Sequence, residues 1–130
     1  MTKKTIWITG GSTGIGKALA IRFASKGWNV AISARRVELL DDLSNSYDNI
    51  FGFPLDVTDK ERCKEVFNEI KNKFENVDIC FFSTGTWDPK KEKNIDVGQM
   101  EDVFKVNFFG TVNSIKAVEQ YFRDKKNGII

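Results

Sequence analysis

The sequence predicts a doubly wound α/β fold, in which helices cover both faces of a parallel sheet. Short segments rich in β-branched and aromatic residues alternate with segments of helical periodicity, as in consecutive βαβ units. The first short segment, Thr5–Thr9, is apolar at successive positions, which is typical of a strand buried on both faces. A glycine-rich stretch, residues 10–16, leads directly into a helix. This alternation predicts a parallel sheet with right-handed crossovers, and the strand order expected for the fold is 3-2-1-4-5.

The first βαβ unit is the clearest. A helix begins at about Gly14, and apolar residues four apart predict its buried face: Ile15, Leu19 and Phe23. Gly27 is expected to end this helix in the left-handed conformation, with Trp28 packing back on it. The second strand is predicted over Asn29–Ser33.

The same alternation continues along the chain. The later elements are predicted as a helix over 37–43, strands over 50–55 and 77–82, a long helix over about 97–122, and the start of a fifth strand at 128–130. Thr58-x-x-Glu61 indicates a capping box that opens another helix. Its apolar face is Cys63, Val66, Phe67, Ile70 and Phe74. Pro54 cannot donate to a strand ladder, so the third strand should lie at an edge of the sheet.

Length and composition indicate one globular domain over residues 1–130. This length suffices for one hydrophobic core but not for two domains. The net charge of +2 favours neither nucleic acid nor an anionic membrane as a partner. No apolar run approaches the roughly 20 residues of a membrane span, and the N-terminus has no signal-peptide core, so a cytoplasmic protein is expected.

The absence of histidine and the spacing of the two cysteines limit the kinds of active site and metal site that this chain can form. A sequence without histidine cannot form a Ser-His-Asp triad, a Cys-His dyad or a His-ligated metal site. Cys63 and Cys80 do not have a metal-binding spacing, and we expect two reduced, mostly buried thiols. No metal site is predicted.

The glycine-rich turn lies where an α/β sheet binds phosphates. Glycines there allow a tight turn and let a pyrophosphate approach the backbone at a helix N-terminus. The predicted contacts are Gly10, Ser12, Thr13, Gly14, Ile15 and Gly16. A nucleotide-triphosphate P-loop is a weak alternative, because Ala18 follows Lys17 where that loop needs a Ser or Thr to hold magnesium. A turn that binds nothing is the other alternative.

The spacing Thr-Gly-x-x-x-Gly-x-Gly, from Thr9 to Gly16, resembles that of the short-chain dehydrogenase/reductase family, which has a Rossmann fold. Later segments resemble further motifs of that family, in the same order. Leu55-Asp56-Val57-Thr58 is similar to its adenine-contacting turn, which implies that the Asp56 side chain and the Val57 backbone meet the base.

Ser83-Thr84-Gly85 resembles the family segment that lines the nicotinamide ribose. Phe82 and Ser83 replace two asparagines of that segment, so the resemblance implies only backbone contacts here. Val106-Asn107-Phe108-Phe109-Gly110 resembles the helix segment with the family's active-site asparagine. It implies that Asn107 is catalytic and holds a water in a proton relay.

The end of the second strand predicts the cofactor. Enzymes that prefer NAD usually carry an acidic residue about 20 positions beyond the glycines, where this chain has Ala34. Arg35, with Arg36 assisting, can instead form charge-assisted hydrogen bonds to a 2′-phosphate. A solvated arginine pair is the alternative, but cations oppose the dipole at a helix start. We therefore expect NADP(H), with NAD less favoured.

The family's catalytic serine and Tyr-x-x-x-Lys are expected beyond Ile130. Tyr121 and Lys125 match the second motif literally. They lie on the helix that carries Asn107, before the fifth strand, whereas the family's pair follows that strand. We therefore expect this pair to be a coincidence of spacing.

The sequence thus predicts the N-terminal, cofactor-binding part of an NADP(H)-dependent oxidoreductase. Its full-length form would reduce a carbonyl or oxidise an alcohol on a small molecule, and the 130-residue chain alone would be inactive. A non-catalytic NADP(H)-binding sensor or regulatory module is the alternative, and an assembly role of the long helix is a third. Apolar residues on that helix predict self-association, hence a homo-oligomer.

Overall fold

The computed structural model describes residues 3–89 and 93–130. Its sheet has the strand order β3-β2-β1-β4, and every pair is parallel. The strands span Thr5–Thr9 (β1), Asn29–Ser33 (β2), Ile50–Gly52 (β3) and Ile79–Phe82 (β4). This arrangement confirms the predicted class and places β3, which precedes Pro54, at the edge.

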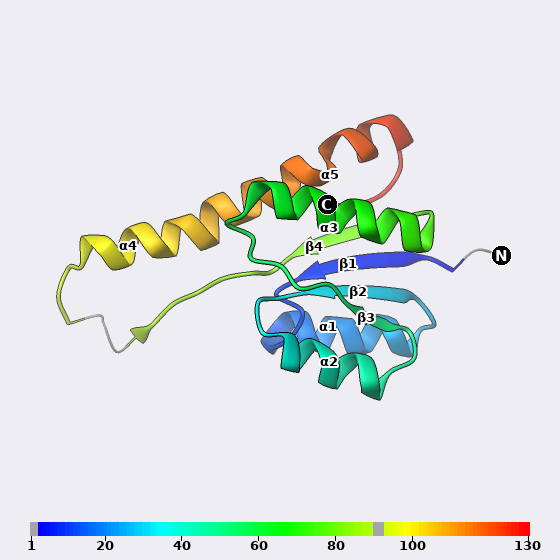
Figure 1. Ribbon diagram of the computed structural model, residues 1–130, viewed down its shortest axis with the longest axis horizontal. Coiled ribbons are helices and arrows are strands. Elements are labelled where there is room, and N and C mark those ends of the chain that lie inside the picture. The colour runs from blue at the N-terminus through cyan, green and yellow to red at the C-terminus, as the bar shows by residue number, and fades with distance from the viewer. Residues whose placement is uncertain (1–2, 90–92) are drawn as a thin grey trace.

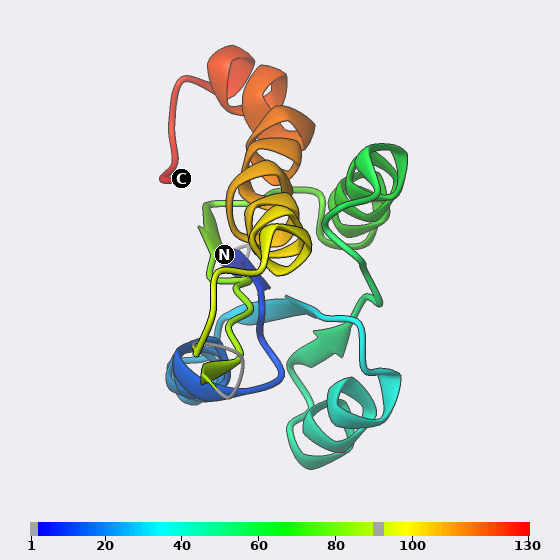
Figure 2. The same cartoon turned by 90° about the vertical axis from the view of Figure 1, so that its left-hand side faces the viewer.

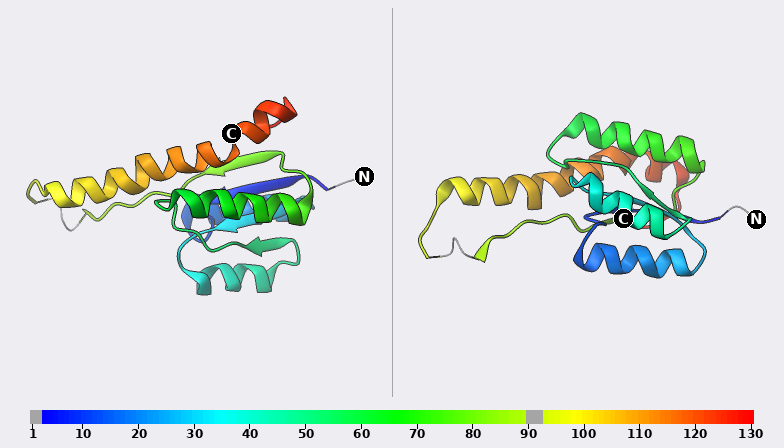
Figure 3. Two further views of the ribbon diagram at one scale, coloured as in Figure 1. Left: turned by 45° about the horizontal axis from the view of Figure 1, so that its top comes forward. Right: turned by 60° about the horizontal axis from the view of Figure 1, so that its bottom comes forward.

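Helices cover both faces of the sheet, with α1 and α2 on one face and α3 and α5 on the other (Figures 1 and 2). Their bounds are Gly14–Ser25 (α1), Val37–Ser46 (α2), Lys60–Phe74 (α3), Val97–Phe104 (α4) and Thr111–Lys125 (α5), with a π-helix, η2, over Lys105–Gly110. The residues that join α4, η2 and α5 keep right-handed helical dihedrals. The three therefore form one rod, which extends beyond the sheet (Figure 3).

Each face of the sheet has its own hydrophobic core. Side chains alternate along β1, so that Trp7 packs toward α3 and α5 while Ile6 and Ile8 pack toward α1 and α2. Trp7 is fully buried and stacks on Phe67 of α3, with 5.7 Å between ring centroids. Burial of both faces explains why β1 is apolar at successive positions.

The last residues of the chain pair with β4. Ile129 forms a parallel bridge with Ile79. The Ile129 N–H donates to the Asp78 carbonyl at 3.0 Å, and the Cys80 N–H donates to the Ile129 carbonyl at 2.9 Å. The segment predicted to begin a fifth strand therefore lies on the free side of β4.

The predicted buried face of α1 is wrong. Gly16, Ala20 and Ala24 are its buried residues, whereas Ile15 is 76% exposed. Leu19 and Phe23 are only partly buried, at the flank of the core. Small side chains let α1 approach the sheet closely, so its contact stripe is set by size and not by hydrophobicity. The predicted end of the helix is confirmed: Gly27 has φ +81°, and Trp28 packs on Phe23 with 4.8 Å between ring centroids.

The predicted capping box is displaced by one residue. The N-cap of α3 is Asp59, whose carboxylate accepts the Arg62 N–H at 3.0 Å. Thr58 does not cap the helix, because its N–H and hydroxyl both donate to Asp56 Oδ1, at 3.0 and 2.7 Å. Asp59, which directly follows Thr58, is an equally favourable N-cap residue, and the capping-box pattern does not take such a neighbour into account.

Several strand and helix bounds also differ from the prediction. β3 ends at Gly52, although the Phe53 and Leu55 N–H groups still donate to the Ile32 and Ala34 carbonyls. Pro54 lies between them and has no N–H to continue a regular ladder. β4 begins at Ile79 instead of residue 77, and α2 extends to Ser46 instead of residue 43. The long helix continues to Lys125, where Lys126 adopts the left-handed conformation.

Both cysteines are free and buried, as expected. Burial raises the pKa of Cys63 to about 11 and raises the pKa of Cys80 still further. Among the described residues, no helix is long and apolar enough to cross a membrane, and no cluster of side chains could hold a metal ion.

Candidate cofactor-binding site

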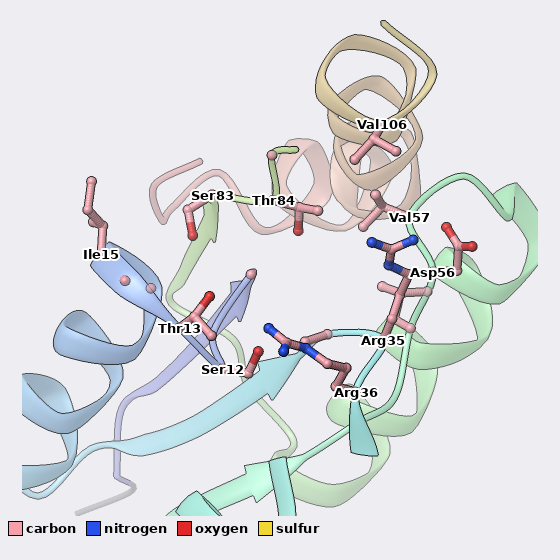
Figure 4. Close-up of a pocket in the computed structure, with 16 residues that line it drawn as sticks. Ser12, Thr13, Ile15, Arg35, Arg36, Asp56, Val57, Ser83, Thr84 and Val106 are labelled. Atoms are coloured by element: carbon pink, nitrogen blue, oxygen red, sulfur yellow. The ribbon is translucent and has the colours of Figure 1, made fainter. Parts of the chain in front are cut away.

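A cleft of about 570 Å³ opens at the carboxyl ends of β1, β2, β3 and β4 (Figure 4). Every residue that the sequence predicted to bind cofactor lines it: Gly10, Ser12, Thr13, Gly14, Ile15, Gly16, Arg35, Arg36, Asp56, Val57, Ser83, Thr84 and Gly85. Ala34, Leu55 and Val106 line it as well. Leu55 and Val106 belong to the motifs quoted above but were given no role. The only signal for them was their position beside Asp56 and Asn107.

Position 10 requires a glycine because the ends of β2 and β4 lie close to it. Gly10 has φ +68°, and its N–H donates to the Ser33 carbonyl of β2 at 2.8 Å. A Cβ at this position would lie 2.8 Å from the Ser83 carbonyl oxygen and 2.9 Å from the Thr84 nitrogen. The turn therefore fits between β2 and β4 only without a side chain.

Gly16 is required by the turn itself. A Cβ here would overlap the Gly10 carbonyl oxygen and lie 2.9 Å from Ser83 Oγ. The N-cap of α1 is Thr13, whose side chain forms no capping hydrogen bond. The first turn of α1 thus brings backbone N–H groups to the cleft without a side-chain acceptor, which suits a bound phosphate.

Two arginines approach the cleft from the loop after β2. Figure 4 shows the Arg36 guanidinium extending toward Ser12 and Thr13, and the Arg35 guanidinium lying beside Asp56 and Val57. Both arginines are exposed, and no carboxylate in residues 3–89 or 93–130 forms an ion pair with either of them. This side of the cleft therefore has two positive charges available for an anion.

Asp56 is held as a carboxylate at the rim of the cleft. Partial burial acts to raise its pKa, but the hydrogen bonds from Thr58 and the charges of Arg35 and Lys105 outweigh it and lower the pKa. An ionised Asp56 can only accept hydrogen bonds, for example from an amino group of a purine.

The backbone of Val57 is positioned by the helical rod. The Asn113 side chain donates to the Val57 carbonyl at 2.9 Å, and the Cys63 thiol lies 3.6 Å from the same oxygen. A Cβ on Gly110 would overlap the Val57 side chain, so the rod touches this loop directly. Val57 itself is buried.

The segment after β4 forms the opposite wall of the cleft. Ser83 donates through both its N–H and its hydroxyl to the Thr9 carbonyl, at 3.2 and 2.7 Å. Its side chain therefore fixes the end of β4 to the end of β1. Figure 4 shows the Thr84 side chain directed into the cleft.

Asn107 lies next to the cleft and does not line it. Its Oδ1 accepts the Thr86 N–H at 2.7 Å, and its Nδ2 donates to the Thr86 carbonyl at 3.0 Å. The side chain thus holds the segment after Gly85 through the backbone. The relay role implied by the family resemblance stays a prediction.

Tyr121 and Lys125 lie at the other end of β4. The Tyr121 hydroxyl accepts the Val77 N–H at 2.9 Å and donates to Asn76 Oδ1 at 3.2 Å. Lys125 Nζ donates to the Val77 carbonyl at 2.7 Å. Both side chains therefore bind the loop before β4, whereas the cleft opens after it. This geometry supports a structural role for the pair.

Comparison with known proteins agrees with this geometry. The short chain dehydrogenase family profile matches residues 4–130. An uncharacterised oxidoreductase of Listeria monocytogenes is 34% identical over 98% of this chain and 53% of its own. The NADPH-dependent 1-acyldihydroxyacetone phosphate reductase of Schizosaccharomyces pombe is 35% identical over 98% of this chain and 43% of its own.

Solved structures show the same likeness. ElxO with NADP bound superposes with a TM-score of 0.88 at 29% identity, over 98% of this chain and 54% of that one. Serine dehydrogenase from Escherichia coli superposes with a TM-score of 0.85 at 25% identity, over 96% of this chain and 59% of that one. The chain spans about half the length of the relatives it matches. A family profile that covers nearly the whole sequence, together with these structural neighbours, shows that the chain belongs to the short-chain dehydrogenase family.

Proposed function

We propose that this chain binds NADP(H) in the cleft and supplies the cofactor-binding half of an oxidoreductase that acts on a small carbonyl or alcohol compound. The bound cofactor would supply the hydride chemistry. Residues 14–16 would hold the pyrophosphate at the start of α1, because its backbone N–H groups meet the cleft there. Asp56 and Val57 would contact the adenine, and Ser83, Thr84 and Gly85 the nicotinamide side.

The arginine pair carries the preference for the phosphorylated cofactor. Arg36 extends toward Ser12 and Thr13, so a phosphate between them could accept hydrogen bonds from a guanidinium and two hydroxyls (Figure 4). Arg35 adds a second positive charge at the same rim. Ala34 leaves no carboxylate at the end of β2 to bind the ribose 2′-hydroxyl of NAD. The names of an NADP-bound neighbour and an NADPH-dependent relative support the same choice.

Asn107 would act in this proposal by positioning the wall that faces the nicotinamide. Its amide fixes Thr86, which directly follows Gly85 in the chain, and Gly85 lines the cleft. Asp56 and Val57 on one side and this wall on the other would then hold the two ends of one extended cofactor.

Calorimetric titration of the chain with NADPH and with NADH tests the proposal. We expect NADPH to bind at least tenfold more tightly, because one charge-assisted phosphate contact contributes about 1.5–3 kcal/mol. Equal affinities would reject the preference for NADP(H). Failure of both to bind would reject the cofactor site itself.

A further inference from the structure

A second cavity lies beside the cofactor-binding cleft, between the segment after β4 and helix α4. Its volume is about 400 Å³. Its apolar lining residues are Trp87, Ile95, Met100, Val103 and Phe104, and its polar lining residues are Lys93, Asn94, Asp96 and Gln99. We call this cavity the Trp87 groove. The segment and the helix extend together beyond the sheet (Figures 1 and 3).

The groove and the cleft are lined by neighbouring parts of the same two stretches of chain. On the strand side, Gly85 lines the cleft and Trp87 lines the groove, two residues further on. On the helix side, Val106 lines the cleft and Phe104 lines the groove. The groove therefore lies further along the segment after β4 and helix α4 than the cleft does.

Two hydrogen-bonded contacts hold the walls of the groove together. Near the cleft, Asn107 fixes Thr86 by its two hydrogen bonds. At the other end, Gln99 Nε2 donates to the Asp88 carbonyl at 3.4 Å. The segment thus runs antiparallel to the helix, with Trp87 between the two contacts.

The chemistry of the groove selects an apolar ligand. Trp87, Met100 and Phe104 are 61%, 51% and 63% exposed, which is unusual for side chains of this size. Asp96 Oδ1 accepts the Gln99 N–H at 3.0 Å, and Gln99 Nε2 donates to the Asp88 carbonyl, so both of these polar side chains are engaged within the protein. What the groove offers is therefore mainly apolar surface, on which a ring or an alkyl chain can be buried.

We propose that the Trp87 groove binds the apolar part of a neutral substrate, a ring or alkyl chain attached to the reacting carbonyl or alcohol carbon. This inference rests on the proposed function. With the phosphates at α1 and the 2′-phosphate at the arginines, the nicotinamide lies toward Ser83 and Gly85, the end at which the groove begins. A carbonyl placed over the nicotinamide could then extend its apolar substituent along α4.

Binding of 4-phenylbutan-2-one, a neutral aromatic ketone, to the 130-residue chain saturated with NADP⁺ tests this proposal. Titration should change the tryptophan emission in a saturable way, and Trp87→Phe should remove that change, because Trp7 is fully buried and Trp28 lies outside the groove. Met100→Lys should weaken ketone binding about tenfold or more, because the bound ring would desolvate the new ammonium group.

Val112→Lys is the matched control. Val112 is an exposed apolar residue of the same rod outside the groove, so its substitution should leave ketone binding unchanged. Both lysine variants should bind NADP⁺ as the unsubstituted chain does, measured by calorimetry. Light scattering of the same samples reports self-association.

Three outcomes would overturn the proposal. The first is equal ketone affinity in the unsubstituted and Met100→Lys chains. The second is displacement of the ketone by NADP⁺, which would place it in the cleft. The third is self-association that Met100→Lys abolishes while ketone binding persists, which would make the groove a contact between copies. Ketone binding that depends on Met100 in a chain that fails to bind NADP⁺ would support the groove and reject the proposed cofactor.

Discussion

The Asn107 side chain and the Thr86 backbone hold each other by two hydrogen bonds, at 2.7 and 3.0 Å, across two separate elements. Asn107 lies in the π-helical part of the rod, and Thr86 lies in the segment after β4. π-helical turns occur frequently at functional sites. Here the turn carries both Val106, which lines the cleft, and Asn107. One short stretch of helix therefore forms part of the cleft wall and also holds the segment after β4 in place.

We expect Asn107→Ala to loosen this wall of the cleft without unfolding the protein. Two hydrogen bonds at an exposed site together contribute about 1–3 kcal/mol. Hydrogen exchange at the Thr86 amide should therefore become faster, and NADPH should bind several-fold more weakly. Asn72→Ala, on the exposed surface of α3, is the control and should change neither quantity. Unchanged exchange at Thr86 would contradict the positioning role.

Arg35→Ala and Arg36→Ala should each weaken NADPH binding and leave NADH binding nearly unchanged. Each removes a charge that can contact the 2′-phosphate, a contribution of about 1.5–3 kcal/mol. Arg22→Ala, at the far end of α1, should not affect either cofactor. Calorimetric titration of the three variants with both cofactors measures the change in affinity for NADPH and for NADH. Equal losses for NADPH and NADH would assign the arginines to a part that the two cofactors share.

Gly16→Ala should destabilise the fold and abolish cofactor binding together. The new methyl group would overlap the Gly10 carbonyl oxygen and crowd Ser83 Oγ, and a backbone carbonyl cannot move aside as a flexible side chain can. Overpacking of this kind costs about 1–3 kcal/mol, measurable by urea unfolding. Gly98→Ala is the matched control, because its Cβ would meet only Asp96 Oδ1, at 3.4 Å. That helical substitution should raise stability by about 0.5–1 kcal/mol.

Asp56→Asn should make the protein less stable at neutral pH and have little effect in acid. The folded-state pKa of Asp56 is lowered, so its contribution to stability is present above the unfolded-state pKa and disappears as the pH falls through the folded-state value. The difference between the two proteins in urea unfolding should therefore shrink below about pH 4. Asp41→Asn, at an exposed position of α2, serves as the control. A difference that persists in acid would point to packing instead of charge.

The fold was predictable from the sequence because its strongest signals are local. A strand buried on both faces, such as β1, must be apolar at successive positions, and a left-handed helix end such as Gly27 needs a glycine. The buried face of α1 was not predictable, because the turn places Gly16 against Gly10 and so rotates Ile15 outward. Hydrophobic periodicity does not contain that constraint, which comes from contact between the turn and the end of β4.

The cleft was predictable to the extent that its residues belong to motifs at strand ends. Parallel strands bring their carboxyl ends to one edge, so residues from four loops meet there without further assumptions. The division between Arg35 and Arg36 was not predictable, since it depends on side-chain directions at the start of α2 (Figure 4). Nor was the pairing of Asn107 with Thr86, because a π-helical turn is not apparent from an apolar helical pattern.

Tyr121 has the spacing of the family's catalytic tyrosine, but its side chain lies at the opposite end of β4 from the cleft. Among the described residues, no tyrosine, lysine or cysteine lines the cleft, and the pKa of its one carboxyl group, Asp56, is lowered, so the cleft offers no side chain suited to act as a general acid at neutral pH. A positioned acid or base contributes a factor of about 10²–10⁴ in rate. We therefore expect this 130-residue chain to show no NADPH oxidation with a panel of ketones and quinones, even where it binds NADPH. Tyr121→Phe should leave this unchanged and lower the free energy of unfolding by about 1 kcal/mol, because it removes the hydrogen bonds to Val77 and Asn76. Turnover by the chain that disappears in Tyr121→Phe would contradict both expectations and would require the tyrosine to reach the opposite end of β4.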